Sequence, residues 1–158
     1  MDILHPKVKL NTSASDSVAA LEERFANERL EWSSKVTSMG IQINKIFEIP
    51  TLMTILYTER QLALEYYHYL ISLLIGINKT YRKSYAERQD FYTNKSQIRY
   101  SNESAKHNRI LVDLEEQVEK REILENHSKF ILATVTTIDN IIYAIPRRVE
   151  IEQISRGK

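Results

Sequence analysis

The sequence contains no cysteine and only three glycines and three prolines among 158 residues. The absence of cysteine excludes a disulfide framework, a thiolate metal site and a cysteine nucleophile. Sheet-rich folds need many tight turns, which glycine and proline supply, so their scarcity favours long helices with few connections. A chain of this length favours a single domain. We therefore expect an all-α protein.

The sequence predicts neither a signal peptide nor a membrane span. The first ten residues include two lysines, an aspartate and a histidine, and they have no apolar region of the kind that signal peptides carry. The most apolar run, residues 62–77, includes Glu65 and His68 and is shorter than the roughly 20 residues that a span needs. We expect a cytoplasmic protein with no membrane partner (the host cell cytoplasm if the protein is viral).

Helical spacing of apolar residues begins after a polar lead. Residues 1–15 predict a flexible N-terminal lead because Asn, Thr and Ser favour non-helical conformations. Ser15 or Asp16 is expected to cap a first helix, which ends near Gly40. Residues 41–49 are ambiguous between a strand and a helix, since an alternating apolar pattern starts there and then breaks.

Two longer helices are expected to follow. Pro50 and Thr51 mark the start of the second helix, with Thr51 as its N-cap, and it runs to about Tyr92. A polar loop over residues 93–104 separates it from a third helix, which extends to about Ile145. The proline that comes next should end or kink that helix, and the apolar residues beyond it suggest a short tail element.

Both long helices carry an apolar seam whose steps alternate mostly between three and four residues, as in coiled coils. Two helices of roughly 40 residues would each be about 60 Å long, and a monomer is not expected to cover both seams. We expect a helical hairpin in a coiled-coil-like bundle that forms a homo-oligomer, with a monomeric antiparallel bundle of shorter helices as the alternative. The residues expected at the contact between protomers are Leu70, Leu74, Ile77, Ile131, Val135, Ile138, Ile142 and Ile145.

Basic and aromatic residues are interleaved over residues 78–109. This segment has eight cations and three acids, a local net charge of +5, whereas the rest of the chain has −4. Cations neutralise phosphates and aromatic faces stack on unpaired bases, so the pattern is typical of single-stranded nucleic-acid binding. The alternative is that the tyrosines are core residues and the cations a solvated face. The predicted phosphate contacts are Arg82, Lys83, Arg88, Lys95 and Arg99, and the predicted stacking residues are Tyr85, Phe91, Tyr92 and Tyr100.

Catalytic and metal-binding patterns are weak. Glu65 and His68 have the spacing of a di-iron ligand pair, but the second such pair that this site needs is not evident, so His68 is expected to be a core or interface residue. The acidic stretch over residues 113–125 is interpreted as a solvated face. The motifs of P-loop nucleotide binding, serine hydrolases and zinc proteases do not occur. We expect no enzyme, no cofactor and no metal site.

The stretch over residues 82–92, RKSYAERQDFY, resembles a motif of the phage UvsY recombination mediator family. Arg88, Asp90 and Tyr92 match that motif, and Phe91 stands in place of a tyrosine. The family's motif lysine, two positions before the arginine, is an alanine in this chain. This departure weakens the transfer of the family's DNA-binding pair.

Two further stretches fit the helical layout of that family. Residues 110–113, ILVD, resemble a hydrophobic stretch that ends in aspartate. Residues 138–141, IDNI, with Arg147 and Arg148 after them, resemble a C-terminal stretch with a nearby arginine. The resemblance spans roughly residues 18–158, and the order and spacing of its motifs carry it.

The resemblance implies a hexameric or heptameric assembly that binds single-stranded DNA. It also implies that the protein helps load a RecA-like recombinase onto DNA coated by single-strand-binding protein. Residues 16–158 would then form a single domain for oligomerisation and DNA binding. The alternatives are a structural or adaptor coiled-coil oligomer, such as a phage assembly component, and a ferritin-like metalloprotein.

Overall fold

The structure is a computed structural model that describes residues 17–157. These residues form four α-helices and no strand, so the all-α prediction is confirmed for this part of the chain. The elements are α1 (Val18–Gln42), the 3-10 turn η1 (Ile46–Glu48), α2 (Ile49–Asp90), the π-helical turn η2 (Phe91–Lys95), α3 (Glu103–Asp113) and α4 (Glu115–Arg156). The predicted flexible lead and its expected caps, Ser15 and Asp16, lie outside the described residues.

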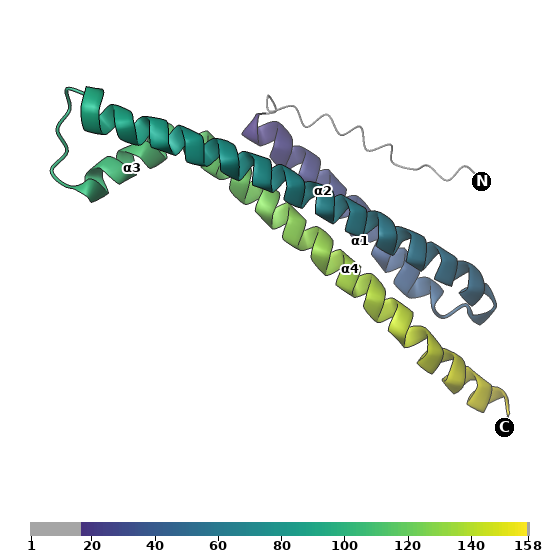
Figure 1. Ribbon diagram of the computed structural model, residues 1–158. Coiled ribbons are helices and arrows are strands. Elements are labelled where there is room, and N and C mark those ends of the chain that lie inside the picture. The colour runs from purple at the N-terminus through teal and green to yellow at the C-terminus, as the bar shows by residue number, and fades with distance from the viewer. Residues whose placement is uncertain (1–16, 158) are drawn as a thin grey trace.

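The molecule is an elongated helical bundle (Figure 1). α2 and α4 lie side by side and run in opposite directions, which gives the expected helical hairpin. α1 packs along the half of this hairpin that is remote from the α2–α3 connection, more extensively on α4 than on α2. α3 folds back beneath the end of α2, and the last turns of α4 extend past the connection between α1 and α2.

Two apolar clusters fill the contact between α1, α2 and α4. Phe25 from α1, Leu70 from α2 and Ile131 from α4 are fully buried in the first cluster. Leu56 and Ile138 are fully buried in the second cluster, which lies nearer the α1–α2 connection. All three helices contribute side chains to both clusters, and each helix presents its apolar stripe to the other two.

The apolar seam packs within one chain, which corrects the expectation that a single chain cannot cover it. Five of the eight residues assigned to the contact between protomers are buried inside this chain: Leu70, Ile131, Val135, Ile138 and Ile145. The other three, Leu74, Ile77 and Ile142, are half-buried against the same clusters. The seam is covered because α1 packs along both long helices. Assembly into a homo-oligomer remains a prediction, and most of its contact would have to come from other side chains.

The start of the bundle differs from the expectation in its caps. Ser17 caps α1, and its side chain accepts a hydrogen bond from the backbone N–H of Ala20 at 3.2 Å. Residues 41–49 contain the end of α1, a turn and η1, so the ambiguous segment is not a strand. α2 begins at Ile49, two residues before the expected N-cap Thr51, and Pro50 lies in its first turn, where no intrahelical N–H bond is lost.

The third predicted helix differs from the expectation in its interior and at its C-terminal end. It is divided at Leu114, which lies between α3 and α4 and has a non-helical backbone, with φ at −111° and ψ at 14°. α4 then continues through Pro146 to Arg156, so the proline does not end the helix and the expected tail element is part of α4. Pro146 is exposed, while Ile145 and Val149 pack on the second cluster. Apolar contacts on both sides of the proline offset the roughly 3 kcal/mol that an interior proline costs a helix.

One helix of the described chain, α4, is long and apolar enough to cross a membrane by length and composition. The most apolar 18-residue stretch of this helix has a mean hydropathy of 1.2, and 33% of that stretch is buried inside the bundle. Core helices of soluble proteins meet the same criteria, so this finding carries little weight in favour of a span.

Candidate nucleic-acid interface

The basic and aromatic segment forms the end of the bundle that α1 does not reach. We call this region the tip and define it as residues 78–114, which comprise the end of α2, η2, the following loop and α3. A small third cluster holds it together, with Tyr92, Ile110 and Leu114 buried at its centre. The α3 helix is set in place by Asn102, whose side chain accepts a hydrogen bond from the backbone N–H of Ala105 at 2.8 Å.

Three of the four predicted stacking residues are packed into the tip. Tyr92 is only 9% exposed, and its hydroxyl donates to Asp113 at 2.5 Å. The ring of Tyr100 packs edge-on against it, with the centroids 5.5 Å apart. Tyr85 is half-buried and its hydroxyl lies 2.7 Å from Nδ1 of His107. In this arrangement the ring of Tyr92 has no free face for a base.

Phe91 is the predicted stacking residue that remains accessible. Its side chain is 42% exposed, and its ring meets the ring of Tyr92 edge-on with the centroids 5.2 Å apart. Both residues belong to η2, a π-helical turn at the C-terminal end of α2. Tyr92 continues the helix stripe of Tyr81 and Tyr85 and is buried, whereas Phe91 lies on the exposed side. π-helical turns are rare and often lie at functional sites.

The cations predicted to contact phosphates differ in how far the protein already neutralises them. Lys83 lies 3.9 Å from Glu87, and Lys95 lies 2.9 Å from Asp90. Hydrogen bonds from Lys95 and Asn94 hold the pKa of Asp90 below its usual value. Both ion pairs are exposed, so they are screened by solvent and contribute little.

Arg82 and Arg99 are exposed and form no ion pair within residues 17–157. Lys79, which belongs to the same basic segment but is not among the predicted phosphate contacts, shares these properties. Lys79, Arg82 and Lys83 lie three and four residues apart and therefore share one face of α2. Ala86, at the position of the family's motif lysine, is exposed and continues the same face.

Arg88 faces the other way, toward α3. It lies 3.8 Å from the carboxylate of Asp113, which also pairs with Arg109 at 3.2 Å. Arg109 additionally donates to the hydroxyl of Tyr92 at 3.3 Å, and this hydrogen bond together with the charge of Asp113 raises the pKa of Arg109. Asp113 is 11% exposed, so its inclusion in a solvated acidic face is wrong. The spacing of four residues between Arg109 and Asp113 was the one sequence signal for this pair.

A second polar cluster lies in the bundle itself, between α1, α2 and α4. His127 is fully buried, stacks on Phe25 with the centroids 3.9 Å apart, and lies 2.8 Å from the carboxylate of Glu28. Tyr66 donates its hydroxyl to the same carboxylate. Burial favours the neutral acid, but hydrogen bonds from His127 and Tyr66 outweigh it, so the pKa of Glu28 lies below its usual value. Burial and the bond to Glu28 raise the pKa of Tyr66.

The candidate metal pair does not form a site. Glu65 and His68 are both exposed; Glu65 accepts a hydrogen bond from Gln61, and His68 packs against the ring of Tyr67. His68 is therefore not a core residue of this chain, and its expected place at an interface stays a prediction. No group of three His, Asp or Glu side chains within residues 17–157 is arranged to hold a metal ion.

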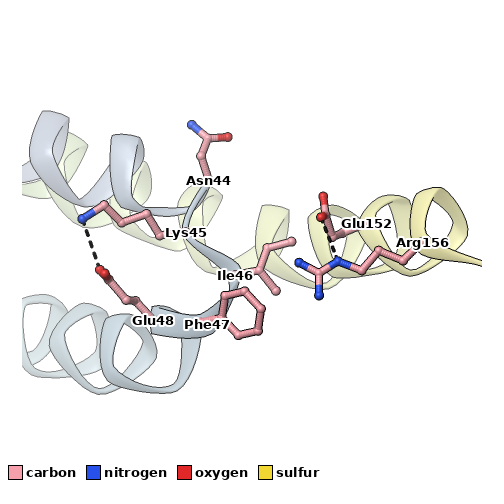
Figure 2. Close-up of a pocket in the computed structure, with 7 residues that line it drawn as sticks. All are labelled: Asn44, Lys45, Ile46, Phe47, Glu48, Glu152 and Arg156. Carbon is pink, nitrogen blue, oxygen red and sulfur yellow. Dashed lines mark hydrogen bonds and ion pairs between the residues drawn. The ribbon is translucent and has the colours of Figure 1, made fainter.

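A shallow, open pocket lies where the α1–α2 connection meets the end of α4 (Figure 2). Phe47 is 83% exposed at its edge, and the guanidinium of Arg156 lies 5.1 Å from the centre of its ring. The charges around it are paired locally, Lys45 with Glu48 at 3.4 Å and Arg156 with Glu152 at 3.1 Å. These paired charges leave no convergent polar group for a ligand.

Comparison with protein-family models, with curated proteins and with solved structures gives no match for this chain.

Proposed function

We propose that this protein is a single-stranded-DNA-binding recombination mediator without catalysis of its own. In this role it helps load a RecA-like recombinase onto DNA coated by single-strand-binding protein. The observation that supports DNA binding is the set of exposed cations at the tip that form no ion pair within residues 17–157, Lys79, Arg82 and Arg99, beside the accessible ring of Phe91. The mediator role rests on the resemblance of residues 82–92 to the UvsY family.

The number of free cations at one tip is small, so a single copy would bind a strand weakly. A homo-oligomer, hexameric or heptameric as the resemblance implies, would repeat the tip and raise the affinity through effective concentration. Exposed apolar side chains are available for contact between copies. Ile75, Ile98 and Val112, which are 65%, 60% and 59% exposed, lie at or beside the tip.

The experiment is a titration of a fluorescent oligothymidylate with the full chain at several salt concentrations. Each phosphate neutralised on a single strand contributes roughly −0.7 to the slope of log K against log salt. Arg82→Ala should weaken binding and flatten the slope by about that amount. The matched control is Arg147→Ala, which removes an exposed arginine from α4 at the opposite end of the bundle and should leave both quantities unchanged. Absence of wild-type binding at low salt would refute the proposal.

A second assay separates the mediator from a simple DNA-binding protein. The wild-type chain should shorten the delay before a RecA-like recombinase acts on DNA that single-strand-binding protein already covers. The Arg82→Ala variant should shorten it less at the same concentration. If the chain binds DNA normally but does not shorten this delay, the protein binds DNA without acting as a mediator.

The alternative is a structural or adaptor oligomer, and one observation favours it. Tyr85, Tyr92 and Tyr100 hold the tip together, which is the role of core residues rather than of stacking platforms. This alternative predicts the same self-association but no salt-sensitive binding of DNA, so the titration described above distinguishes the two functions.

A further inference from the structure

Three side chains from three elements converge on the carboxylate of Asp113. Arg88 comes from α2, the Tyr92 hydroxyl from η2 and Arg109 from α3, at 3.8, 2.5 and 3.2 Å from its oxygens. The carboxylate is almost buried, but the side chains of Arg88 and Arg109 are 49% and 51% exposed. An anion in solution can therefore reach both guanidinium groups from outside.

A guanidinium group binds a carboxylate and a phosphate through the same planar set of donors. The 3.8 Å separation between Arg88 and Asp113 exceeds hydrogen-bond distance, so this arginine keeps most of its donors unused. Because both guanidinium groups are half-exposed, solvent screens their ion pairs with Asp113 and weakens them. The two arginines thus resemble a phosphate site whose present occupant is a side chain of the protein.

We propose that Asp113 is an internal competitor for nucleic-acid phosphate, and that Arg88 and Arg109 bind a backbone phosphate once its carboxylate moves away. This inference rests on the proposed function, and it adds Arg109 as a phosphate contact and Asp113 as the group that restrains the site. In the closed tip, Asp113 neutralises part of the charge of both arginines. The resting protein then presents fewer free cations than its sequence suggests.

The position of Asp113 allows this movement. It is the last residue of α3, and Leu114, which follows it, has left helical geometry before α4 begins. A change of the Asp113 side-chain torsions would move the carboxylate without breaking the backbone hydrogen bonds that Leu114 makes at this junction. The hydroxyl of Tyr92 holds the carboxylate in its present place from a neighbouring element.

The test compares Asp113→Asn with Glu115→Gln in the oligothymidylate titration. Both variants remove one negative charge at the α3–α4 junction, but Glu115 is exposed and pairs with no cation among residues 17–157. The amide oxygen that Asp113→Asn introduces would still accept from Tyr92. Asp113→Asn should raise the affinity about tenfold, the effect of one added charge-assisted contact, and should steepen the salt slope by roughly 0.7 to 1.4 for one or two phosphates. Glu115→Gln should change both quantities much less.

Arg109→Ala, introduced into the wild type and into Asp113→Asn, shows whether the gain in DNA affinity comes from Arg109. In the wild type this change should cost little affinity, because Asp113 already neutralises Arg109. In Asp113→Asn it should remove most of the gain, so that the two changes are strongly non-additive. Tyr92→Phe provides a variant without a change of charge: it keeps the ring, removes the hydroxyl that holds Asp113, and should also raise the affinity.

The outcomes separate this inference from the proposed function. If the wild type binds and Arg82→Ala weakens binding, but Asp113→Asn behaves like Glu115→Gln, Asp113 does not compete and this inference alone is wrong. Equal effects of Arg109→Ala in both backgrounds would also overturn it. If neither the wild type nor Asp113→Asn binds the oligonucleotide at low salt, the proposed function fails. Circular dichroism and the melting temperature of Asp113→Asn establish that the tip stays folded, and if it does not, Tyr92→Phe decides in the same assay.

Discussion

Replacing Glu28 with alanine should destabilise the bundle by about 2–4 kcal/mol at neutral pH. Its carboxylate accepts from the buried Nε2 of His127 at 2.8 Å and from the hydroxyl of Tyr66. Each hydrogen bond to a charged acceptor contributes roughly 1.5–3 kcal/mol, so two would give about 3–6 kcal/mol. The Glu28 side chain is 27% exposed, and water that reaches the vacated space lowers this range.

The effect of the substitution should depend on pH. The pKa of Glu28 lies below its usual value in the folded chain, although burial acts against this, because His127 and Tyr66 donate hydrogen bonds to the ionised form. A carboxyl whose pKa is lowered by folding stabilises the protein above its unfolded pKa of about 4.3. This stabilisation is lost as the pH falls through the folded pKa. The difference between wild type and Glu28→Ala should therefore be full at pH 7 and should shrink in acid.

The measurement is the free energy of unfolding by urea, followed by circular dichroism at equal protein concentrations between pH 3 and pH 8. Glu31→Ala is the matched control, because Glu31 lies on the same helix, is exposed and has no ion pair within the described chain. It should change the free energy by less than about 0.5 kcal/mol. Equal stability of Glu28→Ala and wild type at pH 7 would mean that this polar cluster does not hold α1 to the bundle.

Two further substitutions test the surface of α2. Gly76 is exposed in the middle of α2, and a Cβ added there meets no atom within 4 Å. Gly76→Ala should therefore raise the free energy of unfolding, measured by urea titration, by roughly 0.5–1 kcal/mol. A loss of stability would show that another copy of the chain packs on this face. Ala86→Lys should restore the family's motif lysine on the face that carries Arg82, raise the affinity for oligothymidylate and steepen its salt slope by roughly 0.7; an unchanged slope would place this face outside the DNA contact.

The helices are predictable from sequence because their apolar stripes are long and regular. The second helix is expected to end near Tyr92, and α2 with η2 ends at Lys95. The helix boundaries that were predicted wrongly are set by packing rather than by the local sequence. Leu114 divides two helices without glycine or proline, because its own burial in the tip fixes the junction. Pro146 continues a helix because its neighbours pack on the second cluster.

The candidate site is predictable only in part, since sequence gives the residue types but not their partners. The exposed position of Arg82 follows from its place opposite the seam. The sequence leaves two interpretations of Tyr92 open, a stacking residue or a core residue, and the α3 helix that folds back onto it decides for the core. The sequence places Asp113 in a solvated acidic face, since five of its neighbours up to residue 125 are glutamates. Only the folded chain brings Arg88 to its carboxylate.

The distribution of buried side chains reconciles the stacking prediction with the burial of Tyr92. The part of the bundle that contains α1 has two apolar clusters, whereas the tip has three buried apolar residues, Tyr92, Ile110 and Leu114. Regions with few buried apolar contacts open at a lower free-energy cost than the rest of a protein. Many of the interactions that close the tip are hydrogen bonds and ion pairs. A phosphate can replace Asp113 as the partner of its arginines. A base could stack on Tyr92 only after such an opening, so the closed tip would bind a strand through its cations and Phe91 alone.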